Sequence, residues 1–109
     1  LNNWYPQEIL TDTTRAQRSL EVLSARARRA FLDYQPLRPS PEDPERIYRS
    51  FPYGPSLEVF MLDERSYRGP NSPNRQPRLG QDTDFLGSEQ MRWLKASLAA
   101  SKATWKVIA

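Results

Sequence analysis

The chain contains 109 residues with 16 basic and 13 acidic side chains, which give a formal net charge of +3, and it contains no cysteine and no histidine. This length suffices for one ordinary domain and excludes two, and no apolar run approaches the length that spans a bilayer. Without Cys and His, the chain by itself excludes the usual zinc sites and thiol or imidazole nucleophiles, so any metal bound here needs Asp, Glu, Asn or backbone ligands.

The first predicted element is an amphipathic helix over about residues 13–34. Its apolar side chains recur mostly at spacings of three and four residues, Asp12 and the threonines beside it are candidate N-caps, and the helix must end before Pro36. The arginines of this segment are mixed with acidic residues and do not form a basic stripe with interleaved aromatics. The pattern indicates a solvated helix face, and no specific nucleic-acid recognition is expected.

Proline dominates the middle of the chain. Residues 36–45 are predicted to form a proline-rich loop, because proline lacks the N–H group that helices and central strands need. Residues from about 46 to 62 predict a β-hairpin with a turn signal at Tyr53 and Gly54. The second strand of this hairpin, from Leu57, is nearly all apolar, which is typical of a strand covered on both faces in a parallel sheet.

The last part of the chain predicts a βαβ unit. A long polar loop over residues 63–87 leads to a helix over about 88–101 and then to a strand over about 104–109, which should run parallel to the second hairpin strand. One helix leaves sheet surface uncovered, so the helix over 13–34 or absent parts of a longer protein must cover the rest. We therefore expect an internal fragment, residues 1–109, of one larger catalytic domain, and self-association of the isolated fragment through its unpaired strand edges.

A cluster of charged and phenolic side chains follows the apolar strand. Asp63, Arg65, Tyr67 and Arg68 lie outside the carboxyl end of that strand, where ligands bind in open α/β sheets. Arginine forks match phosphate oxygens, and a tyrosine hydroxyl can orient an attacking or leaving oxygen. The spacing also fits a structural alternative, in which Asp63 forms an ion pair with Arg65 and pins the loop.

Two neighbouring asparagines, Asn2 and Asn3, stand near the start of the sequence. Each amide oxygen is a suitable ligand for a hard metal ion. Asparagines in a loop also satisfy backbone groups, which is the structural alternative here. The spacing leaves both interpretations open.

Several short phrases carry a family resemblance. In chain order they are Asn2 to Pro6, Arg46 to Phe51 with Tyr53-Gly54, Phe60 to Asp63 with Arg65 to Arg68, Leu86-Gly87 with Gln90 and Trp93-Leu94, and Ser101 to Ile108. Together they cover nearly the whole chain and resemble the alkaline phosphatase D family, the PhoD-like metallophosphatases. The resemblance rests on the ordered set of phrases.

The resemblance implies a parent enzyme on a metallophosphatase α/β sandwich. Such a parent is an alkaline phosphatase or phosphodiesterase that hydrolyses phosphate mono- or diesters with calcium and iron, or another dinuclear metal pair, and it is usually periplasmic or extracellular. In the family, an Asp-Asp-His-Glu phrase precedes the segment matching Asn2 to Trp4, and further site residues follow the segment matching Trp105 to Ile108. The principal metal ligands are therefore expected outside this sequence, and the fragment alone is expected to hold no metal and to be inactive.

For this chain, the resemblance leads to a hypothesis about individual side chains. Asn2 or Asn3 lies beside the metals, Arg65 or Arg68 faces the phosphate, and Asp63 orients an arginine at the rim of the site. A competing interpretation is a non-enzymatic module, in which the proline-rich middle and the arginine-rich helix bind another protein or a polyanion.

Overall fold

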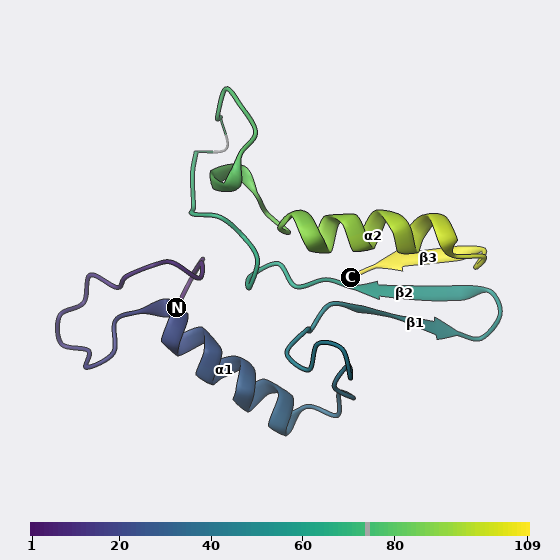
Figure 1. Ribbon diagram of the computed structural model, residues 1–109, viewed down its shortest axis with the longest axis horizontal. Coiled ribbons are helices and arrows are strands. Elements are labelled where there is room, and N and C mark those ends of the chain that lie inside the picture. Colours follow the sequence, from purple (N-terminus) through teal and green to yellow (C-terminus); the bar gives the residue numbers. More distant parts are fainter. Residues whose placement is uncertain (74) are drawn as a thin grey trace.

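The computed structural model describes residues 1–73 and 75–109, and it shows a mixed α/β arrangement (Figure 1). The elements in chain order are α1 (Leu20–Tyr34), β1 (Arg49–Tyr53), β2 (Leu57–Met61), the short 3-10 helix η1 (Gln81–Thr83), α2 (Ser88–Ala100) and β3 (Trp105–Ile108). The predicted α/β class, with an N-terminal helix, a hairpin and a βαβ unit, is confirmed. Among the described residues, no helix combines the length and the apolar character that crossing a membrane requires.

The strands form one 3-stranded sheet in the order β1-β2-β3. β1 and β2 are antiparallel, with Phe51 opposite Val59, and β2 and β3 are parallel, with Val59 opposite Val107. Two parallel strands need a crossover connection, and α2 provides it. The Leu62 N–H donates to the Ala109 carbonyl oxygen at 2.7 Å, so the parallel pairing continues to the point where the chain leaves the sheet.

The core lies between the sheet and α2. Phe60 of β2 is fully buried, and its ring centroid lies 6.5 Å from that of Trp93 in α2. Tyr48, which is also buried, packs against Trp93 with a centroid distance of 4.9 Å. Leu94 of α2 is buried as well, and Leu10 and Leu20 are buried where the N-terminal segment pairs with the start of α1. Because successive strand residues point to opposite faces of a sheet, the neighbours of Phe60 in β2 point away from α2.

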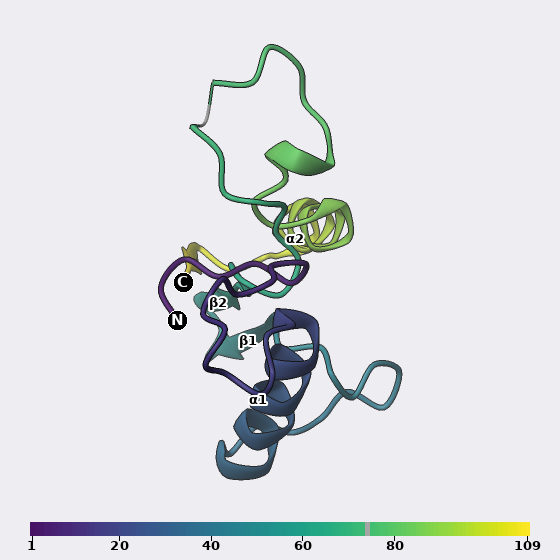
Figure 2. The ribbon, with the colours of Figure 1, turned by 90° about the vertical axis from the view of Figure 1, so that its left-hand side faces the viewer.

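No helix of the described residues covers the other face of the sheet, so of the two expected sources of cover, the first helix does not provide it. The strand register places Phe51, Met61, Trp105 and Val107 there, and we call these residues the open face. Met61 is 40% exposed and Trp105 is 69% exposed. α1 does not cover them, because it lies beyond β1 whereas α2 lies along β2 and β3 (Figures 1 and 2).

The first helix begins at Leu20, so the prediction that it begins near residue 13 is wrong. The Asp12 carboxylate accepts hydrogen bonds from the Thr14 N–H at 3.1 Å and from the Thr14 hydroxyl at 2.6 Å, which closes a local turn. Such side-chain bonds compete with helix formation. The segment that follows then pairs with an earlier one, since the Leu10 N–H donates to the Arg18 carbonyl oxygen at 2.9 Å.

Residues 36–45 contain neither helix nor strand. Arg49 of β1 fastens the neighbouring backbone, because its guanidinium donates to the carbonyl oxygens of Arg38 at 2.8 Å, Arg46 at 2.8 Å and Ile47 at 2.9 Å. One charged side chain thus satisfies carbonyl groups that have no strand or helix partner.

The loop between β2 and α2 projects from the molecule and closes at a narrow neck (Figures 1 and 2). At this neck the Gly69 N–H donates to the Asp84 carbonyl oxygen at 2.7 Å. A Cβ atom at position 69 would lie 2.1 Å from the Gln81 carbonyl oxygen, so the close approach requires glycine. At the end of the loop, Gly87 has a φ of 75° and lies against the Tyr67 backbone, so a side chain is excluded there too.

Candidate functional site

Asp63 is the first residue after the parallel pairing ends, and it is 8% exposed. Its Oδ1 accepts hydrogen bonds from the backbone N–H groups of Arg65 at 3.0 Å and Ser66 at 2.9 Å. This is a side-chain turn that redirects the chain as it leaves the sheet. Asp63 therefore orients the backbone of Arg65 and not its guanidinium, and the alternative of an Asp63–Arg65 ion pair is not observed among the described residues.

Arg65 lies beside the N-terminal segment. Its Nη2 donates to the Oδ1 of Asn3 at 3.4 Å, so residues far apart in sequence meet outside the carboxyl end of β2. Asn3 has a φ of 53°, in the left-handed region that asparagine tolerates better than most residues. Asn2 is exposed. Asn3 is exposed as well, so the two asparagines differ in that Asn3 alone contacts the predicted arginine cluster among the described residues.

Arg68 points into the projecting loop. Its Nη2 donates to the Oδ1 of Asn71 at 2.9 Å, and its guanidinium lies 4.9 Å from the centre of the Phe85 ring. The Nδ2 of Asn71 in turn donates to the carbonyl oxygen of Asn3. A line of hydrogen bonds therefore joins Arg65, Asn3, Asn71 and Arg68, and Arg68 also braces the loop.

Three buried polar atoms of this cluster have no hydrogen-bond partner among the described residues: Asp63 Oδ2, Arg65 Nη1 and Arg68 Nε. Among the described residues, neither the Arg65 nor the Arg68 guanidinium forms an ion pair with a carboxylate. An unsatisfied buried donor is costly, on the order of 1–3 kcal/mol, so such groups call for a ligand or another partner. The two arginines retain N–H groups that an anionic acceptor would satisfy.

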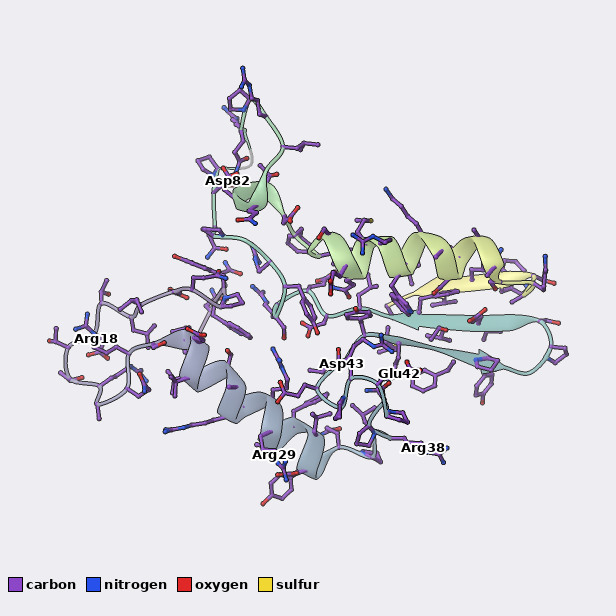
Figure 3. All side chains as sticks on the ribbon, in the orientation of Figure 1. Arg18, Arg29, Arg38, Glu42, Asp43 and Asp82 are labelled. Carbon is purple, nitrogen blue, oxygen red and sulfur yellow. The ribbon has the colours of Figure 1, made fainter. Side chains whose placement is uncertain are left out.

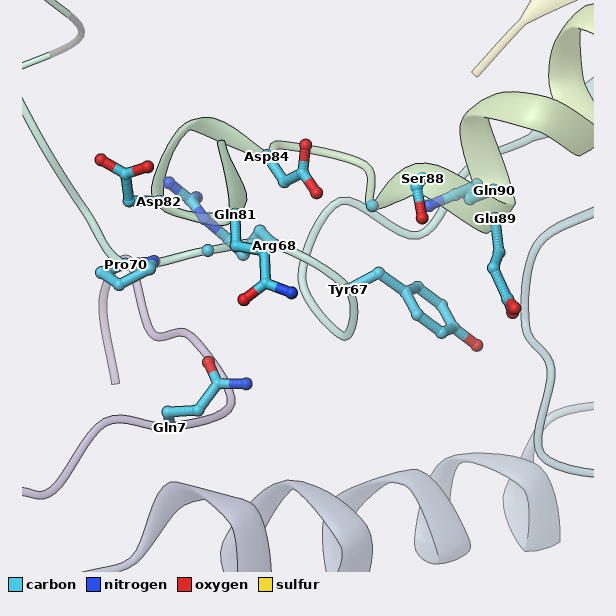
Figure 4. Close-up of a pocket in the computed structure, with 12 residues that line it drawn as sticks. Gln7, Tyr67, Arg68, Pro70, Gln81, Asp82, Asp84, Ser88, Glu89 and Gln90 are labelled. Atoms are coloured by element: carbon cyan, nitrogen blue, oxygen red, sulfur yellow. The ribbon is translucent and has the colours of Figure 1, made fainter. Parts of the chain in front are cut away.

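Tyr67 belongs to the packed part of the site. Its ring centroid lies 5.4 Å from that of Tyr48, and Figure 4 shows its side chain directed away from Arg68. Burial raises the pKa of Tyr67 to about 12, against the opposing effect of Arg28. The phenol therefore stays protonated well above neutral pH and does not act as a base there.

Gln90 is the residue that the charge pattern does not single out. It is fully buried in the first turn of α2, and its side-chain amide bonds to the backbone of Asp63 and to the carbonyl oxygen of Leu86. The sequence does contain a signal for this residue. Gln90 is a polar residue four positions before Leu94, which places it on the apolar side of the predicted helix.

A cavity of about 660 Å³ lies next to this cluster, between the loop and the start of α2 (Figure 4). Tyr67 and Arg68 line it, but Asp82, Asp84 and Glu89 do so as well. Three carboxylates against one guanidinium make this cavity a poor match for a phosphate group. The Arg65 side of the cluster, beside Asn3, is therefore the better candidate for an anion.

The described residues do not form a metal centre. They contain no group of three or more His, Cys, Asp or Glu side chains that is placed to hold a metal ion. The Asn3 amide oxygen already accepts a hydrogen bond from the positive guanidinium of Arg65, which competes with a metal cation for the same oxygen. Any metals used by a larger protein would need their main ligands from other residues.

Comparison with known proteins gives this geometry a family context. A family model described as PhoD-like phosphatase matches residues 1–109. The chain belongs to this family. A solved structure described as "Structure of PhoD" is 30% identical in sequence, with a TM-score of 0.67 over 98% of this chain and 22% of that one. The chain thus spans less than a quarter of that PhoD chain, and no match was found among curated proteins.

Proposed function

We propose that this chain forms part of the phosphate-facing rim of a phosphoesterase. The observation that carries the proposal is the Arg65 guanidinium, which is held at Asn3 while its Nη1 is buried without a partner among the described residues. Guanidinium forks recognise phosphate oxygens through paired, charge-assisted hydrogen bonds. Membership of the PhoD-like phosphatase family supplies the reaction class, the hydrolysis of a phosphate ester.

Three side chains have distinct parts in this proposal. Arg65 faces the phosphate, and Asp63 fixes the backbone that carries Arg65. Arg68 contributes positive charge near the phosphate without contacting it, because its Nη2 is bound to Asn71 and its guanidinium lies over the Phe85 ring. Arg68 Nε is buried without a partner among the described residues, which would also fit a direct contact with phosphate. Mutation of Arg68 tests whether this residue contributes to catalysis.

The proposal extends to the parent protein. The parent is a metal-dependent alkaline phosphatase or phosphodiesterase, exported to the periplasm or the extracellular space, with calcium and iron or another dinuclear pair. When bound, such a pair supplies a Lewis-acid clamp on the phosphoryl group and a hydroxide nucleophile. Its ligands come from outside these residues, with Asn2 or Asn3 beside it, and the isolated chain is inactive and self-associates.

The alternative of a polyanion-binding module has less support, because part of the positive charge of the described residues is already paired. Arg15, Arg28 and Arg29 each pair with a carboxylate, at 3.0, 3.3 and 3.0 Å respectively. The basic and acidic residues labelled in Figure 3 lie in several parts of the molecule: Arg18 on the segment before α1, Arg29 on α1, and Glu42 and Asp43 on the loop before β1. Polyanion-binding modules concentrate their positive charge in one stripe.

Mutation of the arginines in the full-length parent tests the proposal. Arg65→Ala is expected to lower kcat/KM for bis(p-nitrophenyl) phosphate by about tenfold or more, equivalent to ~1.4 kcal/mol of lost transition-state stabilisation. Arg26→Ala, on the exposed side of α1, is the matched control and should leave the rate unchanged. The proposal is wrong if Arg65→Ala and Arg68→Ala each stay within about twofold of the parent rate.

A further inference from the structure

Gln90 makes a compact set of hydrogen bonds. Its Oε1 accepts from the Asp63 N–H at 2.8 Å, and its Nε2 donates to the Asp63 carbonyl oxygen at 2.8 Å and to the Leu86 carbonyl oxygen at 2.9 Å. The residue has no exposed surface. Both N–H groups of the amide and one side of its oxygen are therefore used in a dry environment, where each bond is costly to lose.

The amide stands in for a neighbouring strand. β3 pairs with β2 up to Phe60 opposite Ile108, and the Leu62 N–H still reaches the Ala109 carbonyl oxygen. At Asp63 the backbone N–H and C=O need new partners, and the Gln90 amide offers an acceptor and a donor as a peptide group would. The side chain thus ends the sheet without leaving a buried backbone group unsatisfied.

Gln90 also joins the two ends of the projecting loop. One end is Asp63, and the other is Leu86, which receives the second N–H of the same amide. The Asp63 carboxylate in turn accepts a hydrogen bond from the Arg65 backbone N–H, and the Arg65 guanidinium donates to Asn3. Hydrogen bonds therefore connect Gln90 to Arg65 through Asp63. We propose that Gln90 is a positioning residue, which aims Arg65 at the phosphate by fixing Asp63. This step rests on the phosphoesterase function proposed above.

The chemistry explains why glutamine is needed. Methionine at position 90 would fill a similar volume and make none of the three hydrogen bonds. Glutamate would still accept from the Asp63 N–H, but its carboxylate would face the carbonyl oxygens of Asp63 and Leu86 without a proton to donate. Protonation of that buried carboxyl at lower pH would restore one donor. Gln90→Met and Gln90→Glu therefore differ in their pH dependence.

A double-mutant cycle in the full-length parent tests the path through Arg65. Gln90→Met is expected to lower kcat/KM for bis(p-nitrophenyl) phosphate by roughly tenfold, as for other residues that orient a functional group. The same substitution in an Arg65→Ala background should cost less than about twofold, because the group that it positions is already gone. Arg92→Met, an exposed change on the same helix, is the control. Additive losses in the two backgrounds would overturn the proposal.

Two further measurements separate this proposal from the phosphoesterase function. Hydrogen exchange of the Arg65 and Ser66 amides should be faster in Gln90→Met than in Arg92→Met, whether or not the parent hydrolyses phosphate esters. Unchanged exchange would overturn the positioning role even if the Arg65 test succeeds. If Gln90→Met fails to fold, Gln90→Glu decides: its activity relative to the parent should rise as pH falls, and a ratio independent of pH contradicts the proposed bonds.

Discussion

The two faces of the sheet are built from the same strands, yet they differ in what covers them. Toward α2, Phe60 has no exposed surface and packs against Trp93. On the open face, Phe51 is 44% exposed and Val107 is 45% exposed. The side chains are similarly apolar on both faces, so apolar character shows that a surface needs a partner but does not show whether the chain itself provides one.

Removal of one phenyl ring from each face gives the largest expected contrast. Phe60→Ala should destabilise the folded chain by about 3 to 5 kcal/mol, because it leaves a cavity beneath α2. Phe51→Ala is the matched change on the open face and should cost about 1 kcal/mol or less. Urea unfolding followed by tryptophan fluorescence measures both losses. Equal losses would mean that both faces are covered.

Self-association should follow the open face. In the isolated 109-residue chain, no described strand pairs with the outer edge of β3, and Trp105 and Val107 are exposed, so we expect a second copy to cover them. Val107→Lys should shift the chain toward monomer in light scattering, because a buried charge in the interface is unfavourable.

The control for this shift is Tyr34→Lys. Tyr34 is 86% exposed on α1, away from the sheet, so the same change in charge should leave the association unaltered. If the unsubstituted 109-residue chain is monomeric at all concentrations, the prediction is wrong. Equal shifts from the two lysine variants would also contradict it.

The sequence was sufficient to predict elements whose signals are local. The hairpin and α2 follow from turn residues and apolar spacing that act over a few positions. The predicted start of α1 was wrong for an equally local reason, because hydrogen bonds from Thr14 to Asp12 compete with a helical turn. What covers each face of the sheet depends on tertiary packing, which spacing does not encode.

The site was predictable to the same extent. The position of Asp63, Arg65 and Arg68 after an apolar strand indicates a cluster outside the sheet. Their partners come from distant segments: Asn3 for Arg65, and Gln90 for the Asp63 backbone. An acid beside an arginine suggests an ion pair, but the carboxylate instead satisfies backbone N–H groups that the end of the strand leaves open.

The smallest expected effect concerns the edge of the covered face, where Tyr67 packs on Tyr48. Burial raises the pKa of Tyr67 to about 12, whereas an unfolded tyrosine titrates near ~10. Between these values the unfolded state loses its proton first. The contribution of Tyr67 to stability should therefore be complete below about pH 10 and decline as pH rises toward about 12.

Tyr67→Phe should remove this part of the alkaline decline. The measurement is the free energy of unfolding of the variant and of the parent across that pH range, compared with Tyr53→Phe, which alters an exposed ring 76% accessible to solvent. A difference between parent and Tyr67→Phe that stays constant with pH would show that the phenol is as well solvated when folded as when unfolded. The covered face of the sheet would then end before Tyr67. The loop that carries Arg65 and Arg68 would be held by the Gln90 hydrogen bonds and by the close approach at Gly69, and not by packing against the aromatic core.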